Sequence, residues 1–390
     1  MNKHIYPLLI AQFLSALADN AILFTVIAIV MDSHNDSWYI PAVQSAFTLS
    51  YVVLAPWVGE LADTHIKSHI LFIANIIKAL GAICLLVNIE PIIAYCIVGV
   101  GAAIYNPVKY GILPELAEHH YLIKANSLME GSTILAILLG MLLGAKAADY
   151  SIPFALIGCL SLFLISAFVT TFLPKGTIKP VTKHSKISAF CTEIKAIFTI
   201  NGATFTILGG GLFWLTAATL RVILIVWAPL ILLMKNATEI AELTFFLAIG
   251  IIIGSAIVPK LIPLEKIART RLAAYLMAIF IIMLSLTHDL WSSRGILLLI
   301  GMAGGIFIVP INAQLQEIGQ KSFGSGRAVA LQGFFNNVAM LMGVGCYSFI
   351  TSKGVDPVMA MLLLGFFVII GTLLISLSLP KHPTCTLAKR

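Results

Sequence analysis

Long apolar stretches alternate along the whole chain with short polar or helix-breaking segments. A helix needs about 20 consecutive apolar residues to cross the hydrocarbon core of a bilayer, and in lipid its backbone must form its hydrogen bonds internally. The pattern therefore predicts an all-α membrane protein with twelve transmembrane helices. The stretches lie at about residues 5–31, 40–59, 69–89, 91–110, 126–148, 152–173, 203–232, 241–262, 271–287, 295–316, 328–350 and 356–379.

Composition supports this interpretation and excludes several functional classes. Of the 390 residues, 59% are hydrophobic and only 11% are charged, against about 25% charged in a soluble domain. The six cysteines form no CxxC pair, and the histidines lie mainly in predicted loops. We therefore expect no disulfide framework, no metal site and no cofactor.

The net charge of +7 follows the predicted topology. If both termini are cytoplasmic, seventeen of the 24 Lys and Arg residues lie on the cytoplasmic side and only four on the other. This asymmetry is the positive-inside rule, and it explains the basic character without a nucleic-acid partner.

The first stretch resembles a signal peptide, but its apolar run continues to Met31, so we expect an uncleaved first span.

Residues 174–200 form the longest connection and carry five lysines. They predict a solvated cytoplasmic linker between an N-terminal six-helix bundle, residues 1–173, and a C-terminal bundle with a short cytoplasmic tail, residues 201–390. An internal repeat supports this division, because an offset of 203 places Pro107 over Pro310 and Gly140 over Gly343. Two parallel halves of six helices are typical of the major facilitator fold.

The connection after the second stretch resembles the loop signature of that superfamily, a glycine and an aspartate followed by basic residues. Gly59 would let two helices approach closely, Asp63 would pair with a helix end, and Lys67 would be the trailing base. Thr64 and Ile66 depart from the usual pattern. The alternative is a polar turn that needs only glycine and charges.

Five ionisable residues lie within or at the edges of the predicted spans, and such residues are candidates for function. A charge at the centre of a bilayer costs about 3 kcal/mol on insertion scales, so each must face protein or water. The five are Asp19, Lys78, Lys109, Glu130 and Arg221.

The repeat offset places Asp19 and Arg221 at nearly equivalent positions on the first helix of each half. In the major facilitator fold these helices face each other across a central cavity, so the two opposite charges could form a latch. Alternatively, the pair would only fix helix packing.

Lys109 follows Pro107, and we expect the aromatic rings of Tyr105 and Tyr110 to flank its ammonium. Glu130 is its expected partner, and the alternative is a lysine that extends to the membrane interface. Lys78 has no obvious role from the sequence: it would pair with an acid or reach lipid headgroups.

Several runs resemble one family, the bacterial lysophospholipid transporters of the LplT type, and the resemblance covers nearly the whole chain. The runs are residues 11–21, 98–113, 124–130, 219–222, 309–313 and 315–317. The resemblance implies that Asp19, Asn20, Lys109, Glu130 and Arg221 share their counterparts' functions, and Tyr105 joins them as a candidate cavity residue.

This resemblance further implies a flippase-like carrier in a bacterial inner membrane, active without a proton or sodium gradient. It would move lysophosphatidylethanolamine and lysophosphatidylglycerol from the outer to the inner leaflet for reacylation. The implied functional partner is an acyltransferase/acyl-carrier-protein synthetase, and we expect a monomer.

The residue chemistry fits this function without requiring it. The planar guanidinium of Arg221 suits a phosphate, and Asp19 could accept an ethanolamine ammonium. The chief alternative is a proton-coupled porter of a drug or small amphiphilic metabolite, in which Asp19 would titrate. A membrane acyltransferase is not expected, because no histidine has the H-x-x-x-x-D spacing.

Overall fold

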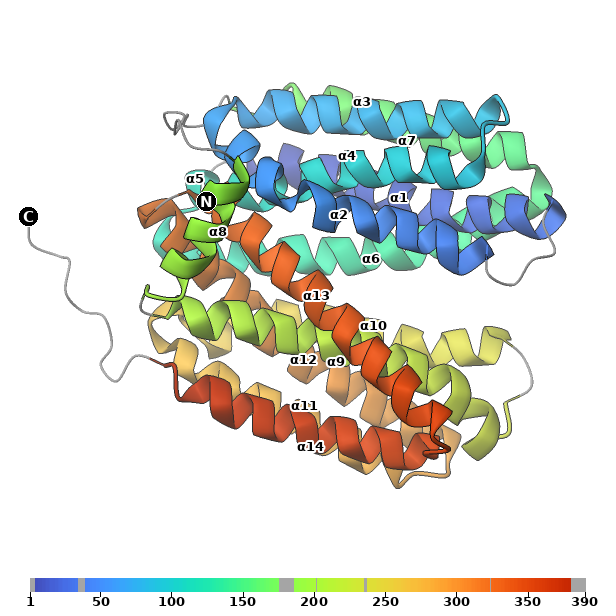
Figure 1. Ribbon diagram of the computed structural model, residues 1–390, viewed down its shortest axis with the longest axis vertical. Helices are drawn as coiled ribbons and strands as arrows, with labels where there is room; N and C mark the ends of the chain where they lie inside the picture. The colour runs from blue at the N-terminus through green and yellow to red at the C-terminus, as the bar shows by residue number, and fades with distance from the viewer. Residues whose placement is uncertain are drawn as a thin grey trace, which may run out of the picture. The chain divides into compact units, whose positions relative to one another are not determined.

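The computed structural model describes residues 4–33, 39–174, 186–200, 202–234, 237–322 and 324–379, and every regular element in these ranges is helical (Figure 1). Each of the twelve predicted stretches corresponds to one long helix, and several stretches extend beyond the end of their helix by one to three residues. These helices are α1 (Ile5–Ser33), α2 (Tyr39–Thr64), α3 (Lys67–Leu86), α4 (Pro91–Gly111), α6 (Leu122–Tyr150), α7 (Ile152–Thr170), α9 (Ala203–Ile231), α10 (Ala237–Leu261), α11 (Thr270–Ser285), α12 (Leu290–Lys321), α13 (Ser325–Ser352) and α14 (Pro357–Ser376).

Eleven helices in the described part of the chain are long and apolar enough to cross a membrane. The remaining stretch of the twelve is also a continuous helix, α2, but it does not count among the eleven. The shorter elements are α5 (Leu113–Leu116), α8 (Lys186–Ile197), η1 (His119–Tyr121) and η2 (Leu264–Arg269).

The chain forms two compact units. Unit 1 comprises Met1–Ala125, Ser132–Glu193 and Gln316–Phe334, and unit 2 comprises Asn126–Gly131, Ile194–Leu315 and Phe335–Arg390. Unit 1 thus contains α1 to α5, α7, most of α6 and α8, the end of α12 and the beginning of α13. Unit 2 contains α9, α10, α11 and α14 with the remaining segments.

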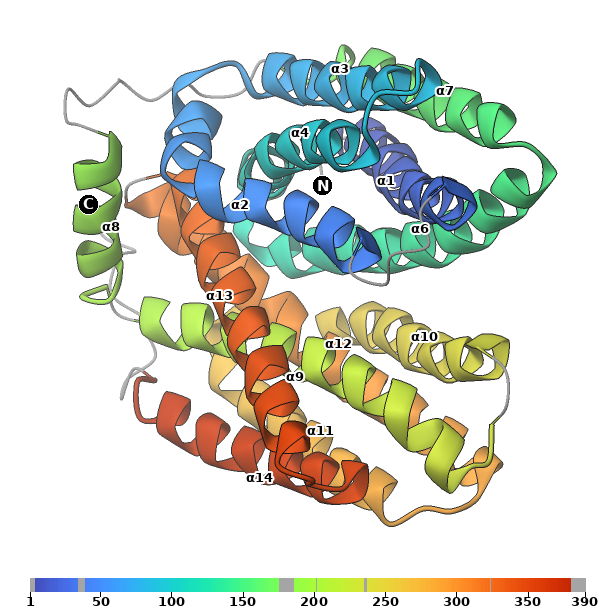
Figure 2. The same ribbon diagram turned by 45° about the vertical axis from the view of Figure 1, so that its right-hand side comes forward.

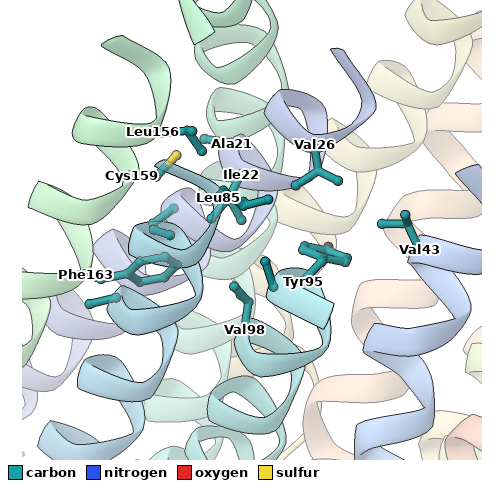
Figure 3. Close-up of a cluster of buried hydrophobic side chains, with 14 of the residues drawn as sticks. Ala21, Ile22, Val26, Val43, Leu85, Tyr95, Val98, Leu156, Cys159 and Phe163 are labelled. Atoms are coloured by element: carbon teal, nitrogen blue, oxygen red, sulfur yellow. The ribbon is translucent and has the colours of Figure 1, made fainter. Parts of the chain in front are cut away.

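Unit 1 is built on α1, α3, α4 and α7, which lie side by side (Figure 2). The core of this unit includes side chains from α1, α2, α3, α4 and α7 that are almost fully buried (Figure 3). In a membrane, helices associate through close packing and small residues rather than through exclusion of water. Gly144 of α6 shows this, because a Cβ added there would lie 2.5 Å from the Cα of Ala21 on α1. Labelled members of the core are Ala21, Ile22, Val26, Val43, Leu85, Tyr95, Val98, Leu156, Cys159 and Phe163.

Unit 2 uses the same kind of packing, with α14 against α11 and α9. The close approach of α10 and α12 depends on Gly301, where an added Cβ would collide with the carbonyl of Leu247.

The connection that we predicted as a solvated linker contains helix α8. Phe190 and Ile197 on this helix are buried, whereas Cys191 and Lys195 are exposed. The Phe190 ring packs edge-on against Phe334 of α13, with 5.6 Å between ring centroids. The helical spacing of apolar residues in 190–197 was present in the sequence, but the neighbouring lysines concealed it. Part of the connection is therefore a packed element rather than a solvated loop.

Candidate functional site

Asp19 lies near the middle of α1 and forms an ion pair with Lys78 of α3. The Lys78 Nζ is 2.6 Å from the Asp19 Oδ2, and the two side chains are 1% and 19% exposed. A carboxylate at this depth was expected to face protein or water. In unit 1, Asp19 faces protein, and its nearest polar neighbour is the buried ammonium of Lys78.

Lys78 is also held by a chain of hydrogen bonds that joins three helices. Its Nζ donates to Ser15 Oγ at 2.9 Å, and Ser15 donates to Asn75 Oδ1 at 2.8 Å. Asn75 Nδ2 donates to Ser166 Oγ of α7 at 2.9 Å, and Ser166 donates to the Ala11 carbonyl at 2.6 Å. A buried polar network whose members are satisfied in this way gives its groups a single arrangement.

Two aromatic rings complete the surroundings of the ammonium. The Lys78 Nζ lies 4.7 Å from the ring centroid of Tyr105 and 5.7 Å from that of Phe163, distances at which the ring face attracts a cation. The expectation that Tyr105 flanks Lys109 is wrong. The face of α4 that carries Tyr105 and Gly101 packs on α3, and a Cβ on Gly101 would lie 2.6 Å from the Lys78 Cγ.

Within unit 1, Asp19 has an ion-pair partner that the sequence did not suggest, because the observed pair is with Lys78. The repeat offset pointed to Arg221, which lies in unit 2, and that pairing stays a prediction. An offset between halves relates equivalent positions and carries no information on contacts between α1 and α3 within one half. The spacing of polar residues within each helix was the available indication. Ser15 and Asp19 are four residues apart and Asn75 and Lys78 are three apart, so each pair lies on one face of its helix.

The remaining candidates are placed on four helices. Arg221 lies on α9 with an exposed side chain and forms no ion pair with any residue that the structure describes. Lys109 is buried on α4, 4.9 Å from the Tyr110 ring. Asn20 donates to the Ala16 carbonyl of its own helix at 2.8 Å. Glu130 is buried on α6 in unit 2, and its pairing with Lys109 stays a prediction.

The loop-signature residues meet the beginning of α13 within unit 1. Asp63 accepts hydrogen bonds from the backbone amides of Gly326 and Arg327, both at 3.0 Å. A carboxylate is favourable at this position because helix N-termini carry free amides and a partial positive charge. Gly59 permits close approach, since its added Cβ would lie 3.0 Å from the Arg327 Cα. The contact expected between Asp63 and a helix end is therefore present.

Lys67, the trailing base of the signature, is 2% exposed and pairs with Glu115 of α5 at 2.8 Å. The sequence alone did not suggest Glu115 as the partner of Lys67. Ser325 adds a second link to the same end of unit 1, because its Oγ donates to the Gly111 carbonyl at 2.7 Å.

Helix α8 contributes Glu193, whose Oε1 lies 3.3 Å from the Arg327 Nη1. Burial raises the pKa of the Glu193 carboxyl, while the Arg327 guanidinium opposes the shift and the nearby carboxylates of Glu60 and Asp63 reinforce it. Four segments distant in sequence thus meet at one end of unit 1: the end of α2, α5, α8 and the beginning of α13. The described residues contain no cluster of three or more His, Cys, Asp or Glu side chains that could hold a metal ion.

Comparison with known proteins places the chain in a family. The family model of the Major Facilitator Superfamily matches residues 8–344. The lysophospholipid transporter LplT of Photorhabdus laumondii is 36% identical over 362 residues, covering 92% of this chain and 91% of that protein. The LplT of Klebsiella pneumoniae is 40% identical over 367 residues, covering 92% and 91%.

The chain belongs to the LplT family of the major facilitator superfamily. It is a multi-pass membrane protein, and its LplT relatives are transporters rather than enzymes. The resemblance inferred from the sequence is thereby confirmed.

Solved structures agree on the fold of this LplT family member. The Escherichia coli fucose:proton symporter FucP has a TM-score of 0.76 at 12% identity, covering 97% of this chain and 98% of that one. A bacterial homologue of the iron transporter ferroportin, in an outward-facing state, has a TM-score of 0.74 at 16% identity, covering 96% and 98%. These identities support the shared fold and carry no information on substrate.

Proposed function

We propose that this protein transports lysophospholipids across a bacterial inner membrane. The observation that carries the proposal is the similarity to LplT relatives, which is 36% to 40% identity over 92% of the chain. The match to the superfamily model, residues 8–344, includes the charged residues of the spans and the signature loop. The finer proposal is that lysophosphatidylethanolamine and lysophosphatidylglycerol move from the outer to the inner leaflet for reacylation.

The headgroup chemistry supports this proposal. A lysophospholipid carries an anionic phosphodiester, and the Arg221 guanidinium has no acidic partner among the described residues. An arginine binds phosphate through a planar set of donors, whereas a lysine acts as a point charge. In the ethanolamine lipid, the Asp19 carboxylate would accept the ammonium. The proposed binding set is Asp19, Asn20, Tyr105, Lys109, Glu130 and Arg221.

The proposed mechanism is alternating access between two six-helix halves, residues 1–173 and 201–390, joined by the connection 174–200. The signature residues Gly59, Asp63 and Lys67 would stabilise one of the alternating states through the contacts of Asp63 with α13. Both termini would be cytoplasmic, the carrier would work as a monomer, and an acyltransferase/acyl-carrier-protein synthetase would consume its product.

The test is uptake of labelled lysophosphatidylethanolamine by spheroplasts that lack their native carrier, with and without an uncoupler. We expect uptake that survives the uncoupler and disappears with Asp19→Ala in protein that inserts normally. Absence of uptake by well-inserted wild-type protein would overturn the proposal. The alternative would then be a proton-coupled porter of a drug or small amphiphilic metabolite.

A further inference from the structure

The Lys78 ammonium occupies a site that has the chemistry of a cation-binding site. Its nitrogen contacts the Asp19 carboxylate at 2.6 Å, the Ser15 hydroxyl at 2.9 Å and the face of the Tyr105 ring at 4.7 Å. A carboxylate, a hydroxyl oxygen and a ring face are groups that bind small cations. The site lies between helices of unit 1, and the lysine side chain that fills it is 1% exposed.

We propose that Lys78 is a tethered counterion, a covalently attached cation in the place where a cation-coupled carrier would bind a proton or a metal ion. Asp19 is then neutralised without any ion from solution. The lipid can be carried through the cycle without taking a cation along. This inference rests on the proposed function for its transport readout, although the cation site can be tested without substrate.

The arrangement of Asp19 favours this role over a purely structural ion pair. Only Oδ2 of Asp19 is bonded to Lys78, while Oδ1 is buried and has no hydrogen-bond partner among the described residues. An unsatisfied buried acceptor destabilises the folded state, so a pair selected for stability alone would be expected to satisfy both oxygens. The unused oxygen is available to a donor on a substrate that approaches Asp19.

The lysine is positioned by groups that do not touch Asp19. Ser15 donates a hydrogen bond to Asn75 at 2.8 Å, and Asn75 donates in turn to Ser166 at 2.9 Å. Gly101 of α4 leaves just enough room for the aliphatic part of Lys78, because an added Cβ would lie 2.6 Å from its Cγ. The polar network and the packing therefore direct the ammonium to Asp19 rather than toward the membrane interface.

Other titratable groups surround Asp19 without replacing Lys78. Lys109 exerts a longer-range attraction from α4. The Asp19 charge also acts on the hydroxyls of Tyr51, Tyr95 and Tyr105 and on the Cys159 thiol. Among the described residues, Lys78 is the cation within hydrogen-bond distance of Asp19. Removal of Lys78 should therefore leave a site that accepts a proton or a small cation.

A substrate-free test compares thermal unfolding of the purified wild-type, Lys78→Ala and Asp19→Asn/Lys78→Ala proteins. Each is measured across pH and in sodium, ethylammonium or the bulky cation N-methylglucamine. We expect the wild type to be indifferent to these cations. Lys78→Ala should be less stable and should regain stability in ethylammonium, in sodium or at lower pH. The double variant should not respond to the cations and should show only the pH dependence that it shares with the wild type, because it has no carboxylate at position 19 to neutralise.

Lys78→Gln serves as a second variant if the alanine protein does not fold, because it keeps most of the side-chain length without the charge. A Lys78 variant that is indifferent to every cation and has the same pH dependence as the wild type would overturn the inference. A double variant that responds as strongly as the single one would overturn it as well.

Uptake in spheroplasts separates the two proposals. Wild-type uptake should survive an uncoupler, whereas residual uptake by Lys78→Gln should fall about fivefold or more on adding one, a typical size for coupling between two sites. No wild-type uptake together with a cation-dependent Lys78→Ala protein would reject the lipid function and retain the tethered counterion. Wild-type uptake with an uncoupler-insensitive Lys78→Gln protein would reject the tethered counterion.

Discussion

The carboxylate of Asp63 accepts a hydrogen bond from the backbone amide of Arg327 at 3.0 Å, although 264 positions separate the two residues. This contact joins the last turn of α2 to the first turn of α13 within unit 1. It is a helix N-terminus capped by a carboxylate from a distant segment, so charge and helix dipole act together. The hydrogen bond therefore reports whether the end of α2 and the beginning of α13 are packed against each other.

Asp63→Asn should loosen this end of unit 1. The amide keeps one acceptor oxygen but loses the charge, and hydrogen bonds to charged groups contribute about 1.5–3 kcal/mol. The reporter is a cysteine introduced at position 325, where Ser325 is buried. We expect this cysteine to react with a maleimide about fivefold faster or more in the Asp63→Asn protein than in the protein that keeps Asp63, because a loss of about 1.5–3 kcal/mol exposes the site more often. Glu60→Gln removes the same charge one turn earlier and should leave the reaction rate near that of the wild type. Equal labelling of the two variants would contradict the role of Asp63.

The Lys67–Glu115 pair should contribute more to stability than a surface ion pair. Lys67→Ala would leave Glu115, which is 13% exposed, without its 2.8 Å partner. Removal of one member of a buried pair costs about 3 kcal/mol. Thermal unfolding should show losses for Lys67→Ala and for Glu115→Ala, with the double variant losing less than the sum of the two. Additive losses would show that the two side chains act independently.

The contribution of Glu193 should depend on pH. Because burial raises its pKa in the folded protein, the folded state binds the proton more tightly than the unfolded chain. Stability should therefore increase as the pH falls through the raised pKa toward the ordinary value of 4.5, and should level off below it. Glu193→Gln carries no titrating group and should lack this dependence. The measurement is the difference in melting temperature between the two proteins across pH, and a constant difference would refute the prediction.

Gly101→Ala should perturb the Lys78 site through packing alone. The new methyl group would lie 2.6 Å from the Ala74 carbonyl and from the Lys78 Cγ, and overpacking costs about 1–3 kcal/mol. Gly158→Ala on α7 is the matched control, since an added Cβ there meets nothing within 4 Å. It should be neutral or gain up to about 1 kcal/mol from helix propensity. Both are compared by thermal unfolding and by uptake, and equal behaviour would contradict the tight α3–α4 contact.

Arg221→Ala should abolish most lipid uptake while the protein still inserts. Arg221→Lys should retain part of it, because the charge stays and the planar set of donors is lost. Loss of a charge-assisted phosphate contact corresponds to roughly tenfold or more in affinity. The control is Arg271→Ala at the beginning of α11, whose side chain is exposed. Normal uptake by Arg221→Ala would remove Arg221 from the proposed binding set.

Much of the site chemistry could be predicted from residue type and depth alone. A carboxylate in the middle of α1 and basic groups on α3, α4 and α9 are too costly in lipid to lie there without a role. Asp63 was assigned to a helix end because a glycine, an acid and a base followed one another between two spans. The sequence could not identify that helix, because Asp63 and Arg327 are connected only through the folded chain.

The sequence by itself determined the helical class, the positions of the long helices and the family, because lipid admits few backbone structures and because apolar length is visible in one dimension. The tertiary structure decided the pairing of charges. Lys78 had no assigned partner in the sequence, yet it lies 2.6 Å from Asp19. Close packing of α3 on α4 through Gly101 and the Ser15–Asn75–Ser166 hydrogen bonds bring the two charges together. Such contacts depend on which helix faces meet, and a linear pattern does not contain that information.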